Sequence, residues 1–220
     1  MIQIYRDWTP FFSVIICTYN RANLLCRALD SLLTQTYRNF EVLIIDDGST
    51  DDTYKIIKEY FNNDFSIRYF YHKNRGLPFS RNAGILAAAG NFISFLDSDD
   101  EYAPNHLELH KNIIVHNPDI DFIYGYVQVI GSPYVPDLND RNKLVNIDDC
   151  AVGGSFFIKK ELAIALNGFK NLDYGDDSEF YSRVKESKAN IFKSENRTYI
   201  YHRELKDSMT FNYKKNYEKI

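Results

Sequence analysis

Three carboxylates follow an apolar run in the middle of the chain. Residues 92–96 are rich in aromatic and branched side chains and too few for a helix, so they predict a buried strand. Asp97, Asp99 and Asp100 come directly after this strand. Carboxylates packed together in a low-dielectric crevice repel one another unless a cation offsets their charge. The pattern therefore predicts a cation site, with a solvated acidic turn as the simpler alternative.

Oxygen ligands of this kind suit Mg²⁺ or Mn²⁺, which prefer carboxylates, water and substrate phosphates. Asp97 and Asp99 are separated by Ser98, so one carboxylate could meet a metal ion and the other a ribose or a water molecule. A second strand-like run, residues 40–45, also ends in carboxylates, Asp46 and Asp47. The sequence contains neither GxGxxG nor a P-loop, so a diphosphate would be held through metal rather than by a glycine loop.

A third acidic pair, Asp176 and Asp177, lies where a glycine-containing loop becomes a helix. A carboxylate at this position could act as a general base. For the pair taken alone, favourable interaction with the helix dipole is the better explanation. His202 follows the last predicted strand and is a candidate ligand for a metal or a diphosphate, although a lone histidine is more often a surface or core residue.

The elements that must position these side chains alternate between strand and helix over the first 130 residues. This alternation predicts a parallel sheet with right-handed crossovers, in which the acidic loops meet at one edge. The strands are expected at residues 13–17, 40–45, 66–71, 92–96 and 121–130, with helices between them. Residues 1–12 are expected to form a loosely attached arm.

The pattern changes after residue 130. Residues 131–149 are dominated by polar and turn-forming residues and predict a long functional or mobile loop. Strands are then expected at 151–158 and 197–201, and helices at 160–166 and 176–184. The tail from residue 208 onward is polar and aromatic, which favours a solvated end over a membrane-surface contact.

Composition limits the classes of protein that fit. The 220 residues carry a net charge of −4, which argues against a nucleic-acid partner. The three cysteines show no metal-type spacing, and this favours a reducing compartment. The N-terminus lacks a signal-peptide pattern and no apolar run approaches ~20 residues, so we expect a cytoplasmic protein that at most touches a membrane peripherally.

Several motifs occur in a fixed order between residues 13 and 104, and together they are highly specific. With them the chain resembles the glycosyltransferase family 2 enzymes, which have the GT-A nucleotide-sugar fold. The motifs are SVIICTYNR at 13–21, SLLTQTY at 31–37, EVLIIDDGSTD at 41–51, NRG at 74–76, SRNAG at 80–84 and FLDSDD at 95–100. Beyond residue 130 the resemblance thins to Gly153-Gly154, the acidic pair and His202.

The resemblance implies one GT-A domain over residues 1–220, with a single mixed, mostly parallel sheet flanked by helices. Residues 1–130 would bind the nucleotide sugar, and 131–220 would form the acceptor-binding half and the tail. Within the donor site Asp47 would bond the base, Asp97 would face the ribose and Arg81 would approach the base or the diphosphate. The residues implied in nucleotide-sugar binding are Thr18, Tyr19, Arg21, Asp47, Arg81, Asp97 and Ser98.

The resemblance also implies a Mn²⁺ or Mg²⁺ ion bound by Asp99, with Asp97 and His202 as further candidates. Asp177 would be the catalytic base. Where the family has Glu-Asp this chain has Asp-Asp, so the choice between Asp176 and Asp177 stays open. Gly153 and Gly154 would let the acceptor approach the backbone closely.

The implied activity is an inverting, metal-assisted transfer of a sugar from a nucleotide diphosphate sugar, with a UDP-sugar as the expected donor. The acceptor hydroxyl would belong to a glycan or a lipid-linked molecule, and the oligomeric state is left open. The main alternative is a non-catalytic nucleotide-sugar-binding module of the same fold. A sugar-phosphate nucleotidyltransferase is a second alternative, but it should carry a glycine-rich phosphate loop near the first strand, where residues 18–21 read TYNR.

Overall fold

The computed structural model describes residues 9–62 and 66–204. Most of the predicted N-terminal arm and all of the predicted tail from residue 208, with its membrane-contact alternative, therefore lie outside the described residues. In the part of the chain that is described, no helix is long and apolar enough to cross a membrane.

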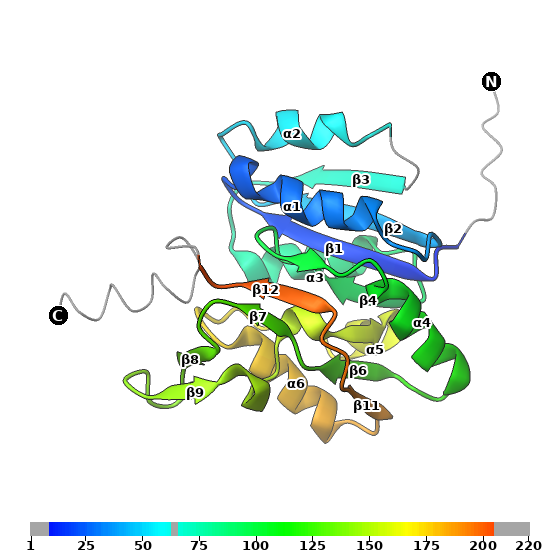
Figure 1. The fold of residues 1–220 in the computed structure, drawn as a ribbon, viewed down its shortest axis with the longest axis vertical. Coiled ribbons are helices and arrows are strands. Elements are labelled where there is room, and N and C mark those ends of the chain that lie inside the picture. The colour runs from blue at the N-terminus through cyan, green and yellow to red at the C-terminus, as the bar shows by residue number, and fades with distance from the viewer. Residues whose placement is uncertain (1–8, 63–65, 205–220) are drawn as a thin grey trace.

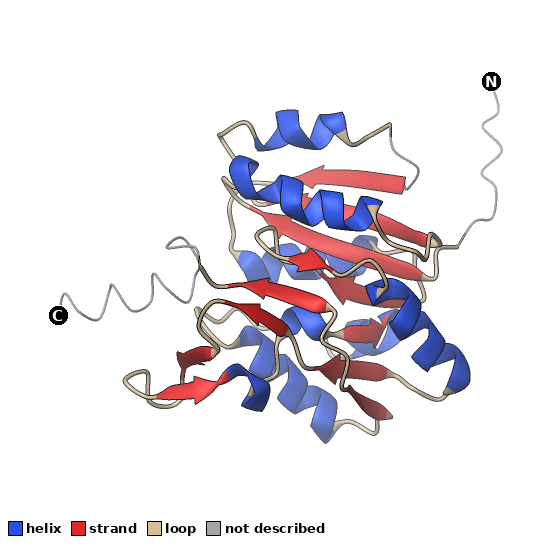
Figure 2. Cartoon of the chain, in the orientation of Figure 1, coloured by secondary structure: helices blue, strands red, loops and turns tan. Residues whose placement is uncertain are grey.

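A seven-stranded sheet with the order β11-β6-β10-β4-β1-β2-β3 forms the centre of the molecule (Figures 1 and 2). Only β10 runs antiparallel to its neighbours, β4 and β6. The strands are β1 Phe12–Thr18, β2 Phe40–Asp46, β3 Ser66–Tyr71, β4 Phe92–Phe95, β6 Phe122–Gly125, β10 Phe157–Lys159 and β11 Ile191–Ser194. The predicted α/β fold with a mixed, mostly parallel sheet is confirmed.

Helices cover both faces of this sheet because successive apolar side chains of a strand point to opposite sides. On β1, Val14 and Ile16 pack into a core cluster with Leu29 of α1, whereas Ile15 packs with Ile85 of α3 in a second cluster. The helices are α1 Ala22–Leu33, α2 Thr53–Glu59, α3 Leu77–Ala87, α4 His106–His116, α5 Lys160–Ala165 and α6 Asp176–Glu186. The first, second and fourth helices belong to the first cluster, and the other three to the second.

Two smaller sheets lie beside the main one, and they correct part of the sequence-based prediction. The predicted strand 121–130 is divided into two strands, β6 and β7 Gln128–Ile130. The second of these leaves the main sheet and pairs with β12 Tyr199–His202. Strand β12 also pairs with β5 Glu101–Tyr102, which completes a three-stranded sheet. The predicted loop 131–149 contains the antiparallel strands β8 Tyr134–Pro136 and β9 Leu144–Asn146. The predicted strand 151–158 begins as a 3₁₀ turn, Gly153–Ser155, before β10.

Candidate active site

A cavity of about 860 Å³ lies at the carboxyl ends of β1, β2 and β4 and is bordered by the start of α6. Ligands of open α/β sheets bind at this edge. The cavity is lined by every residue expected to bind the nucleotide sugar, together with Asp99 and the acidic pair at 176–177. Its walls therefore combine the donor half of the chain with residues from beyond position 130.

The first motif and the DGST motif hold one another at this edge. The Asn20 amide donates to Ser49 Oγ at 2.8 Å, and the Thr50 amide donates to Asn20 Oδ1 at 2.8 Å. Thr18 and Tyr19 precede this contact and line the cavity. The Thr18 hydroxyl is buried and has no hydrogen-bond partner among the described residues, so a bound ligand could satisfy it.

The carboxylate of Asp47 fixes the next loop. It accepts the Arg75 amide at 2.7 Å and the Gly76 amide at 2.8 Å, while His72 Nδ1 lies 3.3 Å from Oδ1. The same loop passes Gly48 so closely that a Cβ there would come within 2.8 Å of the Asn74 nitrogen. Asp47 thus shapes the cavity wall through backbone contacts, and each of its oxygens keeps a lone pair for a ligand donor.

The three carboxylates after β4 have different surroundings. Asp100 is fully buried, and it accepts the Tyr199 hydroxyl at 2.6 Å and the His202 amide at 2.8 Å. It therefore ties the loop to β12 and does not line the cavity. Asp99 does line the cavity, and burial, followed by the charge of Asp97, raises the pKa of its carboxyl.

Arg81 joins the two acidic regions of the site. Its side chain is 5% exposed, and Nη1 lies 2.7 Å from Asp176 Oδ2 while Nη2 lies 3.3 Å from Asp97 Oδ1. The guanidinium also lies 5.1 Å from the centroid of the Phe169 ring. Arg81 was expected near the base or the diphosphate. It lines the cavity, but its fork is turned toward the two carboxylates.

Asp177 has no ion pair of this kind with any residue that the structure describes. Its Oδ2 accepts the Gly153 amide at 3.1 Å, and its Oδ1 accepts the Ser178 amide at 2.8 Å. Burial raises the pKa of Asp177 to about 6, and the neighbouring charge of Asp176 adds to the rise while Arg81 opposes it. A carboxylate with this pKa is ionised at neutral pH yet basic enough to accept a proton.

The structure places Gly153 and Gly154 differently from the expectation for acceptor binding. Both are buried and neither lines the cavity. A Cβ on Gly153 would lie 3.3 Å from the Asp177 Cβ, and a Cβ on Gly154 would overlap the Tyr199 ring. The two glycines therefore make room for Asp177 and Tyr199, which are parts of the protein itself.

His202 does not line the cavity, although the preceding residue, Tyr201, does. Its Nε2 lies 2.7 Å from Glu101 Oε1. Its Nδ1 is buried without a partner among the described residues. A carboxylate on one ring nitrogen and a free second nitrogen is the arrangement of many metal-binding histidines. The described residues nevertheless contain no group of three acidic, histidine or cysteine side chains set closely enough to hold a metal ion.

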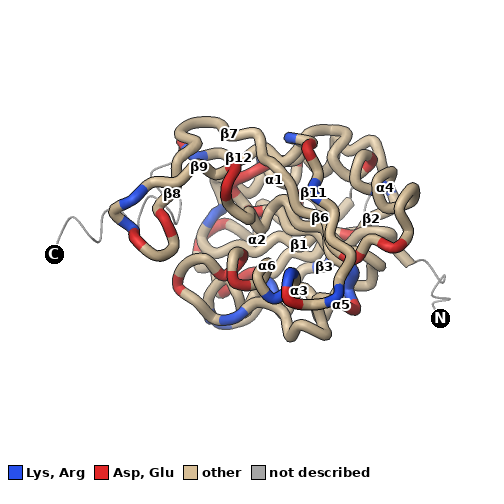
Figure 3. Tube along the Cα trace, turned by 90° about the horizontal axis from the view of Figure 1, so that it is seen from below, with Lys and Arg blue, Asp and Glu red and all other residues tan. Residues whose placement is uncertain are grey.

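The sequence analysis missed the part of the wall that comes from the β8–β9 segment. Val135 and Leu138 line the cavity, and a Cβ on Gly175, whose φ is +76°, would overlap Leu138. Tyr174 donates its hydroxyl to the Pro136 carbonyl at 2.9 Å. The connection between the two strands carries both acidic and basic residues (Figure 3). The only sequence signal for this wall was the unusual length of the predicted loop.

Comparisons with known proteins are consistent across sequence and structure. The model of glycosyl transferase family 2 matches residues 13–216. An uncharacterized glycosyltransferase of Haemophilus influenzae is 32% identical over 192 residues, which cover 84% of this chain and 76% of the relative. Glycosyltransferase GlyA of Streptococcus pneumoniae is 41% identical over 109 residues, which cover 49% of this chain and 16% of GlyA.

Solved structures share the fold. Residues 1–349 of S. aureus TarS, in complex with UDP-GlcNAc, superpose with a TM-score of 0.76 at 23% identity, covering 90% of this chain and 60% of that one. The mannosyltransferase PcManGT of Pyrobaculum calidifontis, in complex with GDP-Man and Mn²⁺, superposes with a TM-score of 0.68 at 19% identity, covering 88% and 57%. Several curated relatives are much longer, and the matched region spans 16–18% of the length of three of them.

Proposed function

The chain belongs to glycosyltransferase family 2, and we propose that it transfers a sugar from a nucleotide diphosphate sugar to an acceptor hydroxyl with inversion at the anomeric carbon. The observation that carries this proposal is the arrangement of the acids around one cavity. Asp47 lies after β2, Asp97 and Asp99 lie after β4, and Asp177 lies at the start of α6. The chain thereby offers a donor pocket and a proton acceptor in one continuous space.

A UDP-sugar is the donor that we propose, and a glycan or a lipid-linked molecule the acceptor. The buried Thr18 hydroxyl lacks a partner among the described residues, and the Asp47 carboxylate can accept a ring N–H of a base. The structural relative TarS binds UDP-GlcNAc and UDP, which supports a uridine nucleotide, whereas PcManGT binds GDP-Man. A guanosine donor is therefore the alternative to include in the test.

We propose Asp99 and Asp97 as the residues that would hold Mn²⁺ or Mg²⁺, with His202 Nδ1 as a further ligand. The two carboxylates fit such an ion, because both line the cavity and these cations prefer carboxylate oxygens. Water and substrate phosphates usually complete their coordination, so the group of three protein ligands that the described residues lack is not required. When bound, such an ion stabilises negative charge on the departing diphosphate. PcManGT in complex with Mn²⁺ supports the choice of metal.

Asp177 is the residue that we propose as general base. Its carboxylate takes the proton of the acceptor hydroxyl as that oxygen forms a bond to the sugar C1. The bond from C1 to the diphosphate oxygen breaks on the opposite face, and its electron pair leaves with the nucleoside diphosphate. Arg81 holds Asp176 at 2.7 Å and so leaves Asp177 as the acid of the pair without a cationic partner among the described residues.

A donor screen tests this function. The full chain is incubated with Mn²⁺ and a panel of UDP- and GDP-sugars, first alone in a thermal shift assay and then with a panel of glycan and lipid-linked acceptors. Donor binding should raise the melting temperature by mass action. The expected product is a nucleoside diphosphate and an inverted glycoside.

Other results identify the alternatives. Tight donor binding without turnover over the whole acceptor panel indicates a non-catalytic module. Release of pyrophosphate from a nucleoside triphosphate and a sugar phosphate indicates a nucleotidyltransferase.

A further inference from the structure

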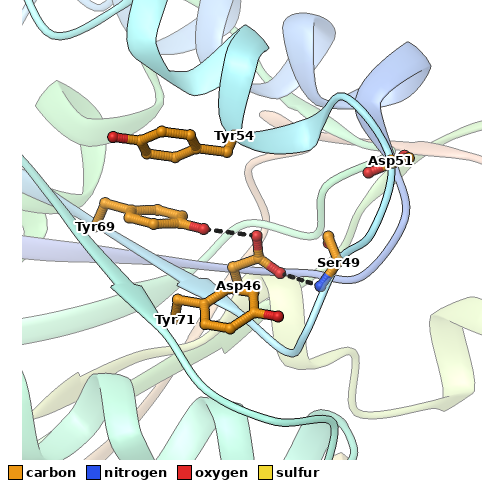
Figure 4. A pocket seen from close by; sticks show the side chains of 6 residues that line it. All are labelled: Asp46, Ser49, Asp51, Tyr54, Tyr69 and Tyr71. Carbon is orange, nitrogen blue, oxygen red and sulfur yellow. Dashed lines mark hydrogen bonds between the residues drawn. The ribbon is translucent and has the colours of Figure 1, made fainter.

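A second, smaller cavity is bordered by the loop that follows β2, the start of α2 and strand β3. Its volume is about 300 Å³, and it shares no lining residue with the large cavity. The lining residues are Asp46, Ser49, Asp51, Tyr54, Tyr69 and Tyr71 (Figure 4). Because β3 is the last strand of the sheet, this cavity opens at the sheet edge, away from the acidic pair on α6.

Tyrosine rings form the walls of this cavity. Tyr69 and Tyr71 are two residues apart on β3 and therefore point to the same side of the strand. The Tyr54 ring comes from α2 and lies 5.1 Å from the Tyr69 ring, centroid to centroid (Figure 4). Tyr54 is 48% exposed and Tyr71 is 59% exposed, so much of their ring surface is open to a ligand.

Two acidic residues, Asp46 and Asp51, line the cavity, and among the described residues they accept hydrogen bonds only from neutral groups. Asp46 is 1% exposed, and it accepts the Ser49 amide at 2.7 Å and the Tyr69 hydroxyl at 2.8 Å. Asp51 accepts the amides of Ala22 at 3.1 Å and Thr53 at 3.0 Å. By contrast Glu41, a buried acid on the same strand as Asp46, pairs with Arg68 at 3.0 Å.

The described residues supply no cation to this cavity. No Lys, Arg or His lines it, and neither of its carboxylates takes part in an ion pair of the described chain. The ammonium of Lys58 lies 5.7 Å from the Tyr54 centroid but does not line the cavity. Carboxylates and the negative faces of aromatic rings both attract a positive charge.

We propose that this cavity binds a small organic cation that carries an ammonium group. The volume lies at the lower end of ligand pockets, which suits a head group of this size. Two carboxylates without a third ligand favour an organic cation over a metal ion. The site is separate from the donor cavity, so the proposal does not depend on the transferase activity.

Calorimetric titration of the full chain with choline chloride and with tetramethylammonium chloride tests the proposal, against sodium chloride at matched ionic strength. We expect saturable binding at one site. Because an exposed cation–π contact amounts to about a two- to fivefold change in Kd, Tyr71→Leu and Tyr54→Leu should each weaken binding by that factor. Asp51→Asn should weaken it as well and avoids altering the buried Asp46.

Tyr134→Leu is the matched control, because Tyr134 is also about half exposed, at 50%, but lies on β8 outside this cavity. Its Kd for choline should equal that of the wild type. Binding of UDP should be the same in Tyr71→Leu and wild type. The proposal is overturned if neither ammonium binds saturably, if Tyr71→Leu binds them as the wild type does, or if neutral monosaccharides bind equally well.

Discussion

Arg81 Nη1 and Asp176 Oδ2 lie 2.7 Å apart, although 95 residues separate them in the chain. This contact ties the helix that follows the NRG motif to the start of α6. The other terminal nitrogen of Arg81, Nη2, contacts Asp97, so one guanidinium positions both the loop after β4 and the acidic pair at 176–177. Asp176 is thereby held by a cation, whereas the hydrogen bonds to Asp177 within the described part of the chain come from backbone amides.

Arg81→Met should lower both stability and turnover. It leaves two carboxylates without their buried cation, and breaking such a pair typically costs about 3–5 kcal/mol of unfolding free energy. Urea unfolding and kcat measure the two effects. Compared with Arg81→Met, Arg81→Lys should restore part of the stability but less of kcat. A single ammonium group lacks the two terminal nitrogens with which Arg81 contacts both Asp97 and Asp176.

Arg68→Met is the control for this prediction, because Arg68 also pairs with a buried acid, Glu41 at 3.0 Å, but outside the site. It should lower stability and leave kcat of the remaining folded protein unchanged. Equal losses of kcat in the two variants would contradict a positioning role for Arg81.

Asp177→Asn should reduce kcat by about 10²–10⁴-fold, the usual contribution of a general base. The amide has the same shape and lacks the basicity, and its NH2 group cannot accept one of the two backbone amides that Asp177 binds. Neither change touches the donor pocket directly, so the dissociation constant for the donor should change little. Steady-state kinetics and calorimetry with the donor check this. Asp119→Asn, at an exposed acid remote from the cavity, should match wild type. If Asp176→Asn abolishes activity and Asp177→Asn does not, the two assignments must be exchanged.

The pH dependence of kcat/KM should show a group with a pKa of about 6, which is the raised value for Asp177. The base works only when ionised, so activity should fall about tenfold per pH unit below that value. Asp176→Asn removes a charge that raises the pKa of Asp177, and it should move the midpoint to lower pH. A midpoint that is the same in both proteins would exclude Asp177 as the titrating group.

Asp99→Ala should abolish the Mn²⁺-dependent part of the thermal shift caused by the donor, because it removes a proposed metal ligand. The shift seen without metal should remain. Asp148→Ala serves as the control, since Asp148 is an acid that pairs with Arg197 outside the cavity. An unchanged Mn²⁺-dependent shift in Asp99→Ala would remove Asp99 from the metal site.

His110 should make stability depend on pH. It is 3% exposed and stacks on Phe157, and burial lowers its pKa from 6.5 to about 4. The unfolded chain therefore binds the proton more readily, so the contribution is full above pH 6.5 and is lost as the pH falls toward 4. Its full size is about 3 kcal/mol. Urea unfolding at pH 7.5, 6 and 5 measures the loss.

His110→Leu should reduce the slope of this dependence without abolishing it, because burial also lowers the pKa of His106, whose ring centroid lies 4.6 Å from that of His110. His116→Leu is the matched control. In both histidines Nδ1 lies close to the carbonyl oxygen four residues earlier, at 2.8 Å for His110 and 2.7 Å for His116, but His116 is on the exposed side of α4. Its pH dependence should follow the wild type. Parallel curves for His110→Leu and wild type would show that another group causes the slope.

Residue pattern alone was enough to predict most of the parallel strands of the sheet and the edge of the sheet at which the cavity lies. The apolar runs of β1, β2 and β4 could only be buried strands, and strands joined by helices run parallel. The residues that follow them must then meet at one edge, as Thr18, Asp47 and Asp97 do. Short strands such as β8 and β9 were not predictable, because three residues show no periodicity and only their partner defines them.

The tertiary structure decided which contacts each of several neighbouring aspartates makes. The sequence places three carboxylates after β4. In the folded chain β12 packs beside this loop, so that Asp100 accepts a hydrogen bond from Tyr199 while Asp99 lines the cavity. Likewise the two adjacent aspartates at the start of α6 are equivalent in sequence. They differ in the folded chain because Arg81, which is 95 positions earlier, donates a hydrogen bond to Asp176. Local pattern determines which side chains reach an edge of the sheet, whereas their pairing and charge depend on distant segments that only the folded chain brings into contact.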